Sequence, residues 1–289
     1  MIIGKIIGGL GNQMFQYAFY KYLEYIKQNK IKLDLSLFKN YSLHNGYELE
    51  RVFNIGEKIA DKDEIERFKS KYPLFFKIEN KLFNKNIIFG TNHFKENNFY
   101  INKKIFDEKI KDFYVEGYFQ TYKYIEELDE NLFEFQTKLN IKELELFQGE
   151  IVSIHIRGGD YVTSKKDNNL FGNICTTEYY KKAIKYIKQN VENPEFIIFT
   201  NDKKYAENIL QGESFKIIDW NTGENSFRDM FLMSQCKHNI IANSSFSWWG
   251  AWLNKNSSKI VIAPDKWFND YKINQKNIIP TNWIRMSSN

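Results

Sequence analysis

Residues 243–253, Asn243-Ser244-Ser245-Phe246-Ser247-Trp248-Trp249-Gly250-Ala251-Trp252-Leu253, directly follow an apolar run, Asn239-Ile240-Ile241-Ala242. The run is typical of a buried strand and the aromatic stretch is typical of a helix, so small hydroxyl residues stand at the predicted helix start. Unpaired N–H groups and the helix dipole both favour negative charge there. The segment therefore indicates an anion site at a helix N-terminus, with an ordinary serine N-cap on a core helix as the alternative.

The alternation of strands and helices extends through the second half of the chain, from Ile151 onward. Strands are predicted at 151–156, 196–200, 215–218, 238–242 and 259–263, and helices at about 177–190, 203–210, 226–236 and 246–254. This regular alternation predicts an α/β domain of the doubly wound, nucleotide-binding kind.

The chain begins with another strand–turn–helix–strand unit. A strand at 2–7, a helix at about 12–29 and a strand at 31–35 predict a parallel α/β sheet here as well. The charged segment 126–147 is predicted to be helical and to connect the two halves. We therefore predict two domains, residues 1–148 and 149–289.

A glycine cluster, Gly8-Gly9-Leu10-Gly11, separates the first predicted strand from its helix. It indicates close approach of the backbone to a ligand, and Asn12 is placed to offer an amide there; a turn needed only for tight packing is the alternative. The cluster partly matches the dinucleotide fingerprint, but Met14 stands where the third glycine belongs. A nicotinamide-dependent oxidoreductase, with Asp34 on the ribose, is therefore a competing hypothesis.

His155 and Arg157 alternate along the strand at 151–156, so their side chains face the same side near its carboxyl end. Ligands bind at that edge in open α/β sheets, and arginine holds phosphate through two parallel hydrogen bonds. A structural arginine–carboxylate pair is the competing interpretation. Asp160 follows on the loop, close enough to reach the same cleft.

Asp202 closes another predicted strand. Its carboxylate could accept hydrogen bonds from a nucleobase or from ribose hydroxyls, or could cap the helix that begins at Lys203. One residue can serve both roles.

Composition excludes several functional classes. The 289 residues are 43% hydrophobic with a net charge of +5, which suits a phosphorylated substrate or an anionic membrane surface, but no basic stripe indicates nucleic acid. Cys175 and Cys236 lack metal-site spacing, and Asp61-Lys62-Asp63 does not follow a strand, so no metal is expected. No signal peptide or spanning run is present, so we expect a cytoplasmic protein, with peripheral contact at the inner face of the plasma membrane left open.

Four segments together resemble the bacterial α-1,2-fucosyltransferases of glycosyltransferase family eleven. The similarity lies in the glycine-rich opening at 8–17, the Gly117-Tyr118-Phe119-Gln120 motif, the His155-to-Tyr161 motif and the block at 236–253. These motifs stand in the family's order along the chain. One position departs from the family pattern, because Gly158 replaces the second arginine of the His155 motif.

The resemblance implies a GT-B fold of two Rossmann-like lobes that face a central cleft, with an acceptor-side lobe first and a GDP-sugar-binding lobe second. It implies inverting, metal-independent transfer of L-fucose from GDP-fucose to the 2-hydroxyl of a galactose-terminated surface glycan such as lipopolysaccharide, with no cofactor. A transferase of another GDP-sugar, or onto another acceptor, is the main alternative, and a non-catalytic glycan-binding protein that uses the tryptophans is a further one.

The resemblance also assigns roles to single residues of this chain. His155 would contact the guanosine, Arg157 the β-phosphate, and Asp202 the base or ribose. The diphosphate would lie at the helix start, and Asn12 would point into the cleft; the helix-start residues are Asn243, Ser244, Ser245 and Phe246. We expect Asp160 to be the base that takes the acceptor's proton.

Overall fold

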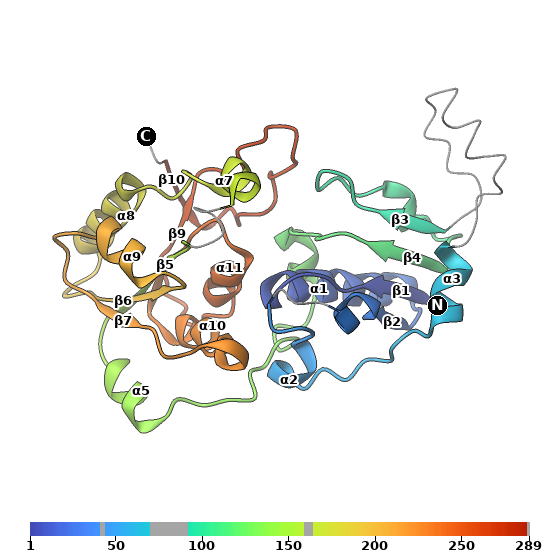
Figure 1. The fold of residues 1–289 in the computed structure, drawn as a ribbon, viewed down its shortest axis with the longest axis horizontal. Coiled ribbons are helices and arrows are strands. Elements are labelled where there is room, and N and C mark those ends of the chain that lie inside the picture. The colour runs from blue at the N-terminus through green and yellow to red at the C-terminus, as the bar shows by residue number, and fades with distance from the viewer. Residues whose placement is uncertain (41–43, 70–91, 159–163, 288–289) are drawn as a thin grey trace.

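The computed structural model describes residues 1–40, 44–69, 92–158 and 164–287, and Figure 1 shows two lobes, each built on its own sheet. Asp160 lies outside the described residues. The α/β class with parallel sheets that the sequence predicts is confirmed.

The C-terminal lobe holds a six-stranded, wholly parallel sheet in the order β10-β9-β8-β5-β6-β7. The strands are β5 (Ile151–Ile156), β6 (Glu195–Thr200), β7 (Lys216–Ile218), β8 (His238–Ile240), β9 (Val261–Pro264) and β10 (Ile284–Met286). Numbered from β5, this is the 3-2-1-4-5-6 order of the dinucleotide-binding fold. All six residues of β5 are buried, as expected for the central strand of a sheet covered on both faces.

Helices follow the strands of this lobe. They are α7 (Lys165–Phe171), α8 (Thr177–Asn190), α9 (Lys203–Ile209), the 3-10 turn η4 (Gly223–Asn225), α10 (Phe227–Gln235) and α11 (Ser245–Trp252). The helices predicted at 177–190, 203–210, 226–236 and 246–254 are therefore confirmed to within a few residues.

The N-terminal lobe holds a four-stranded parallel sheet in the order β2-β1-β4-β3. Its strands are β1 (Ile2–Lys5), β2 (Ile31–Asp34), β3 (His93–Lys95) and β4 (Phe113–Glu116). The long helix α1 (Leu10–Lys27) follows β1, and the shorter pieces are η1 (Ser36–Asn40), α2 (Leu49–Phe53), α3 (Lys62–Lys69) and η2 (Lys103–Phe106).

The two lobes share one hydrophobic core, because α1 packs directly on α11. The Phe15 ring lies 4.6 Å from the ring of Trp248 and 5.1 Å from that of Trp249, and both tryptophans are fully buried. The aromatic helix that the sequence singles out therefore serves as the main contact between the lobes.

The prediction of a helix over 126–147 is wrong. Only the 3-10 turn η3 (Tyr122–Glu127) and the short helix α5 (Ile141–Leu146) form there, and the chain between them is irregular. Phe133 and Phe135 alternate with the exposed Glu134 and pack on the core, so tertiary contacts decide this segment's conformation. The N-terminal sheet precedes this segment in the chain and the C-terminal sheet follows it, and the predicted domain boundary at 148/149 comes just after it.

Candidate functional site

Both sheets have a switch point, where neighbouring strands send their connections to opposite faces, and ligands bind at such points in open α/β folds. In the C-terminal lobe the switch point lies between β5 and β8, so the loops after these strands carry Arg157 and Ser244. In the N-terminal lobe it lies between β1 and β4, which are followed by the glycine cluster and by Gly117–Gln120. His155 lies on β5 itself, and Asp34 and Asp202 lie at β2 and after β6; the other predicted site residues follow these four strands in the chain.

The N-termini of α1 and α11 meet between the lobes. A Cβ on Gly11 would lie 2.6 Å from the backbone carbon of Ser245, so only glycine permits this approach. The Trp249 indole N–H donates to the Gly11 carbonyl at 3.0 Å. At Gly11 the close approach is to the backbone of α11, and the approach of a ligand to the glycine cluster stays a prediction.

Within the described part of the chain, the first turn of α11 lacks a side-chain cap. Ser244 is the N-cap residue, but its hydroxyl makes no capping hydrogen bond in the described structure. The first N–H groups of a helix have no partner within it, which makes this helix start a candidate anion site. Ser244 is buried, whereas Ser245 and Phe246 are partly exposed.

His155 lies on β5 beside this helix start, with its ring 6.0 Å from the Phe246 ring. Burial, and secondarily the charge of Arg157, lowers the pKa of His155 to about 3, so the imidazole is neutral at pH 7. Its buried Nδ1 has no hydrogen-bond partner among the described residues. A buried, unused ring nitrogen beside a partly exposed arginine fits a polar ligand at this position.

Asp202 caps α9, because its carboxylate accepts from the Tyr205 N–H at 3.0 Å. The N-cap interpretation is confirmed, and contact with a base or ribose stays a prediction. Gly158 lies against this residue: its N–H donates to the Asn201 side chain at 2.9 Å, and an added Cβ would lie 2.8 Å from the Asp202 Cβ.

The Asn243 side chain is 3% exposed and holds neighbouring loops together. Its amide donates to the carbonyls of Phe171 at 3.0 Å and Trp267 at 3.2 Å. These bonds fix the loop that begins α11, and contact of Asn243 with a diphosphate stays a prediction.

Asn12 lies on the first turn of α1, partly exposed, and its Oδ1 accepts from the Gln120 Nε2 at 2.8 Å. This bond joins two loops of the N-terminal switch point. Asp34 is fully buried and accepts from the Tyr114 hydroxyl at 2.6 Å, which removes it from any ribose.

Asp229, on the first turn of α10, is a carboxyl group that the sequence analysis missed. Burial raises its pKa to about 7, and Asn221 donates to it at 2.8 Å. A carboxyl group titrating near neutral pH beyond the end of β7 is a further functional candidate. The sequence offered one signal for this residue, namely that Asp229 stands in the first turn of the helix predicted from residue 226.

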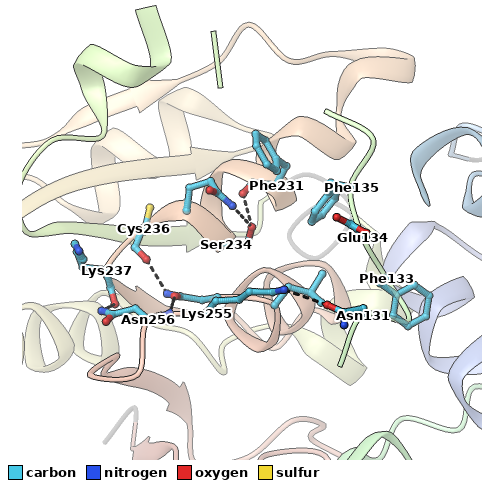
Figure 2. A pocket seen from close by; sticks show the side chains of 13 residues that line it. Asn131, Phe133, Glu134, Phe135, Phe231, Ser234, Cys236, Lys237, Lys255 and Asn256 are labelled. Carbon is cyan, nitrogen blue, oxygen red and sulfur yellow. Dashed lines mark hydrogen bonds between the residues drawn. The ribbon is translucent and has the colours of Figure 1, made fainter. Parts of the chain in front are cut away.

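A separate cavity of about 430 Å³ lies between residues 126–147, the connecting segment of the two lobes, and the ends of α10 and α11 (Figure 2). Phe133, Phe135 and Phe231 line it, and Lys255 reaches across to Asn131 at 3.3 Å. None of the predicted site residues lines this cavity.

Among the described residues, no three His, Cys, Asp or Glu side chains are grouped so that they could hold a metal ion. Within the same residues, no helix is long and apolar enough to cross a membrane.

Comparisons with known proteins match the whole chain. A model described as Glycosyl transferase family 11 matches residues 1–287. An alpha-1,2-colitosyltransferase of Escherichia coli is 37% identical over 298 residues, covering 99% of both chains. The O-antigen biosynthesis glycosyltransferase WbnK of Escherichia coli is 34% identical over 301 residues, covering 96% of this chain and 98% of that protein.

The fold is similar to a solved structure of a mutant Arabidopsis thaliana FUT1 in complex with GDP. The TM-score is 0.50 at 12% sequence identity, and the match covers 90% of this chain and 69% of the other. At this identity the likeness concerns the fold alone, and the expected GT-B architecture is confirmed.

Proposed function

Because the chain belongs to glycosyltransferase family 11, as the match over residues 1–287 establishes, we propose that it transfers L-fucose from GDP-fucose to the 2-hydroxyl of a galactoside in a surface glycan. The transfer is inverting and needs no metal. The observation that carries the proposal is the uncapped N-terminus of α11, which lies at one switch point and meets the start of α1 at the other.

The donor diphosphate takes the place of the anion at this helix start. As GDP departs through an oxocarbenium-like state, negative charge builds on the diphosphate, and the N–H groups of α11 and the Arg157 guanidinium stabilise it. If Arg157 contributes as much as one oxyanion-hole donor, its loss raises the barrier by roughly 2.7–4 kcal/mol. In this proposal the neutral His155 imidazole contacts the guanosine, and the Asp202 carboxylate contacts the base or the ribose.

The acceptor hydroxyl attacks from the side of the N-terminal lobe, and Asn12 lies in the cleft beside it. Asp160 takes the acceptor's proton in this proposal, although it lies outside the described residues. The protein works at the cytoplasmic side of the inner membrane, where its positive net charge supports peripheral contact with anionic lipid.

The second candidate donor is GDP-colitose. Colitose is fucose without its 3-hydroxyl, and a relative 37% identical to this chain is an alpha-1,2-colitosyltransferase. Discrimination between two sugars that differ by one hydroxyl depends on a single hydrogen-bonding contact.

A GDP-release assay tests the proposal. GDP-fucose and GDP-colitose are each supplied with and without lactose, in the presence and absence of EDTA. The mass of the product is determined by mass spectrometry. Lactose-dependent release that survives EDTA, with a fucosylated product, is the expected result. If only GDP-colitose is turned over, GDP-colitose is the donor. If EDTA abolishes GDP release, the transfer depends on a metal.

The matched variants are Arg157→Met and, as control, Arg67→Met on α3. A fall of roughly a hundredfold or more in kcat for Arg157→Met alone is expected from the diphosphate contact. Equal activity of the two variants would remove Arg157 from the mechanism.

A further inference from the structure

The turn after β4 is held rigidly, with one aromatic side chain directed outward. The Glu96 carboxylate accepts from the N–H groups of Tyr118 at 2.6 Å and Phe119 at 3.1 Å. Phe119 has a left-handed backbone (φ 50°), and its buried ring stacks on Phe19 at 4.2 Å. With Phe119 turned into the core, Tyr118 remains 38% exposed.

A strained turn supports Tyr118 from behind. The chain reverses at Asn98 and Phe99, which both have left-handed backbone conformations (φ 48° and 60°) that normally favour glycine. The Phe99 ring lies parallel to the Tyr118 ring, 6.0 Å away at 12°, and contacts Phe268 of the C-terminal lobe at 4.8 Å. Such strain persists where the surroundings fix it, and it clusters at ligand sites.

The next residue, Gln120, carries an unused hydrogen-bond acceptor. Its Nε2 donates to Asn12, which fixes the orientation of the amide. Its Oε1 is buried and meets no hydrogen-bond donor in the part of the chain that the structure describes. Buried acceptors are nearly always satisfied, so a ligand hydroxyl is an appropriate missing partner.

Tyr118 and Gln120 lie where an acceptor site is expected. Gln120 is one hydrogen bond from Asn12 on α1, whose start lies against α11. The turn at Asn98 also reaches the other lobe, because its carbonyl accepts from the Asn274 N–H at 3.0 Å. Figure 1 shows the ends of β3 and β4 directed toward the C-terminal lobe.

We propose that Tyr118 and Gln120 form the subsite for the acceptor sugar; this inference rests on the proposed glycosyl transfer. The C–H face of a galactose ring packs on the outer face of Tyr118, because aromatic faces are electron-rich. A hydroxyl of the same sugar donates to the Gln120 Oε1. Together the two contacts hold the acceptor beside Asn12.

The variants are Tyr118→Leu, which keeps apolar volume without a ring, and Gln120→Met, which keeps length but removes the amide, both the Oε1 acceptor and the Nε2 donor to Asn12. The controls are Tyr25→Leu, an exposed tyrosine near the far end of α1, and Gln136→Met in the connecting segment. Each is assayed with methyl β-galactoside and the donor that the wild-type protein uses. GDP affinity is measured by calorimetry, and the thermal midpoint is recorded as a check on folding.

Tyr118→Leu and Gln120→Met should each raise the acceptor KM roughly two- to tenfold, as expected for one ring contact or one neutral hydrogen bond. GDP affinity should stay as in the wild type, because these contacts lie on the acceptor side. An unchanged acceptor KM would overturn the inference. A loss of GDP affinity parallel to the rise in KM would also overturn it, by showing a purely structural role.

A series of monodeoxy methyl galactosides identifies the hydroxyl. In the wild type one deoxy analogue should be penalised, and in Gln120→Met that penalty should disappear. If every penalty persists, Gln120 does not bind the acceptor. If the wild-type protein neither binds GDP nor transfers sugar, the proposed function itself fails, whereas wild-type transfer with unaffected variants refutes this inference alone.

Discussion

Gly158 shows how one residue constrains the site. The family motif has arginine at this position, but here the backbone of Gly158 lies so close to Asp202 that no side chain fits. The buried glycine brings the end of β5 against the N-cap of α9, and its N–H donates to Asn201. The missing charge is therefore accompanied by a tighter junction between two loops of the predicted nucleotide site.

Gly158→Ala should destabilise the protein by roughly 1–3 kcal/mol, the usual cost of overpacking, because the added Cβ would meet Asp202 at 2.8 Å. Gly56→Ala is the matched control, since a Cβ there meets nothing within 4 Å. Urea unfolding compares the two variants. Equal midpoints would mean that the loop after β5 moves aside without penalty.

His155 should make stability depend on pH. Its pKa is about 3 in the folded state and about 6.5 when unfolded, so only the unfolded state takes up the proton between these values. Stability is therefore undiminished above pH 6.5 and falls as the pH drops below it, by roughly 2 kcal/mol at pH 5.

His155→Gln removes this term. Its free energy of unfolding should change less between pH 7.5 and pH 5 than that of the wild type, as measured by urea denaturation at both pH values. Identical pH dependence in the two proteins would contradict a buried, neutral His155.

At the scale of the elements, sequence predicted those that are long and patterned. Strand β5 was predicted with its full bounds because six consecutive buried residues leave no ambiguity. Strands β3 and β10 were missed because each has three residues, too few for a period, and contains a charged residue, Lys95 in β3 and Arg285 in β10. In the connecting segment only α5 is helical, and its signal was the capping box formed by Asn140 and Glu143.

Helix α11 is completed at its C-terminus by a lysine. The Lys259 ammonium donates to the carbonyls of Ala251 at 2.9 Å, Trp252 at 3.2 Å and Asn254 at 2.6 Å. The carbonyls of Ala251 and Trp252 are orphan acceptors of the helix end, and a cation there also complements the dipole. The lysine thus stabilises the helix whose other end is the predicted anion site.

Lys259→Met keeps the apolar stem and leaves these carbonyls without the ammonium. The variant should lose roughly 1.5–3 kcal/mol of stability, the range for hydrogen bonds to a charged group. Lys255→Met, which removes one exposed contact with Asn131, should change stability by less than about 0.5 kcal/mol. Guanidinium denaturation measures both, and equal losses would deny Lys259 its capping role.

At the scale of the whole molecule, sequence could place each loop at a strand end but could not place the lobes against each other. The bond between Asn12 and Gln120 joins residues 108 positions apart, and that between Trp249 and Gly11 joins residues 238 apart. No local pattern encodes such pairs, because they depend on how α1 packs on α11. Asp229 was missed because only burial in the folded protein raises its pKa.

An ion pair fastens the connecting segment to the C-terminal lobe. The Arg228 guanidinium donates to both carboxylate oxygens of Glu143, at 2.7 and 2.6 Å, and to the Thr137 hydroxyl at 2.6 Å. The Glu143 side chain is only 1% exposed. A carboxylate this deeply buried depends on its partner, since an unpaired buried charge is strongly unfavourable.

Arg228→Met should therefore destabilise the protein by roughly 3–5 kcal/mol, because it leaves the buried Glu143 charge without its cationic partner, with the Asn140 N–H still donating to it at 2.9 Å. The double variant Arg228→Met with Glu143→Leu removes both charges and should recover much of that loss. Urea unfolding of the wild type, both single variants and the double variant completes the cycle. Additive losses would show that the two side chains act independently, and the connecting segment would then be held by the packing of Phe133 and Phe135 rather than by this pair.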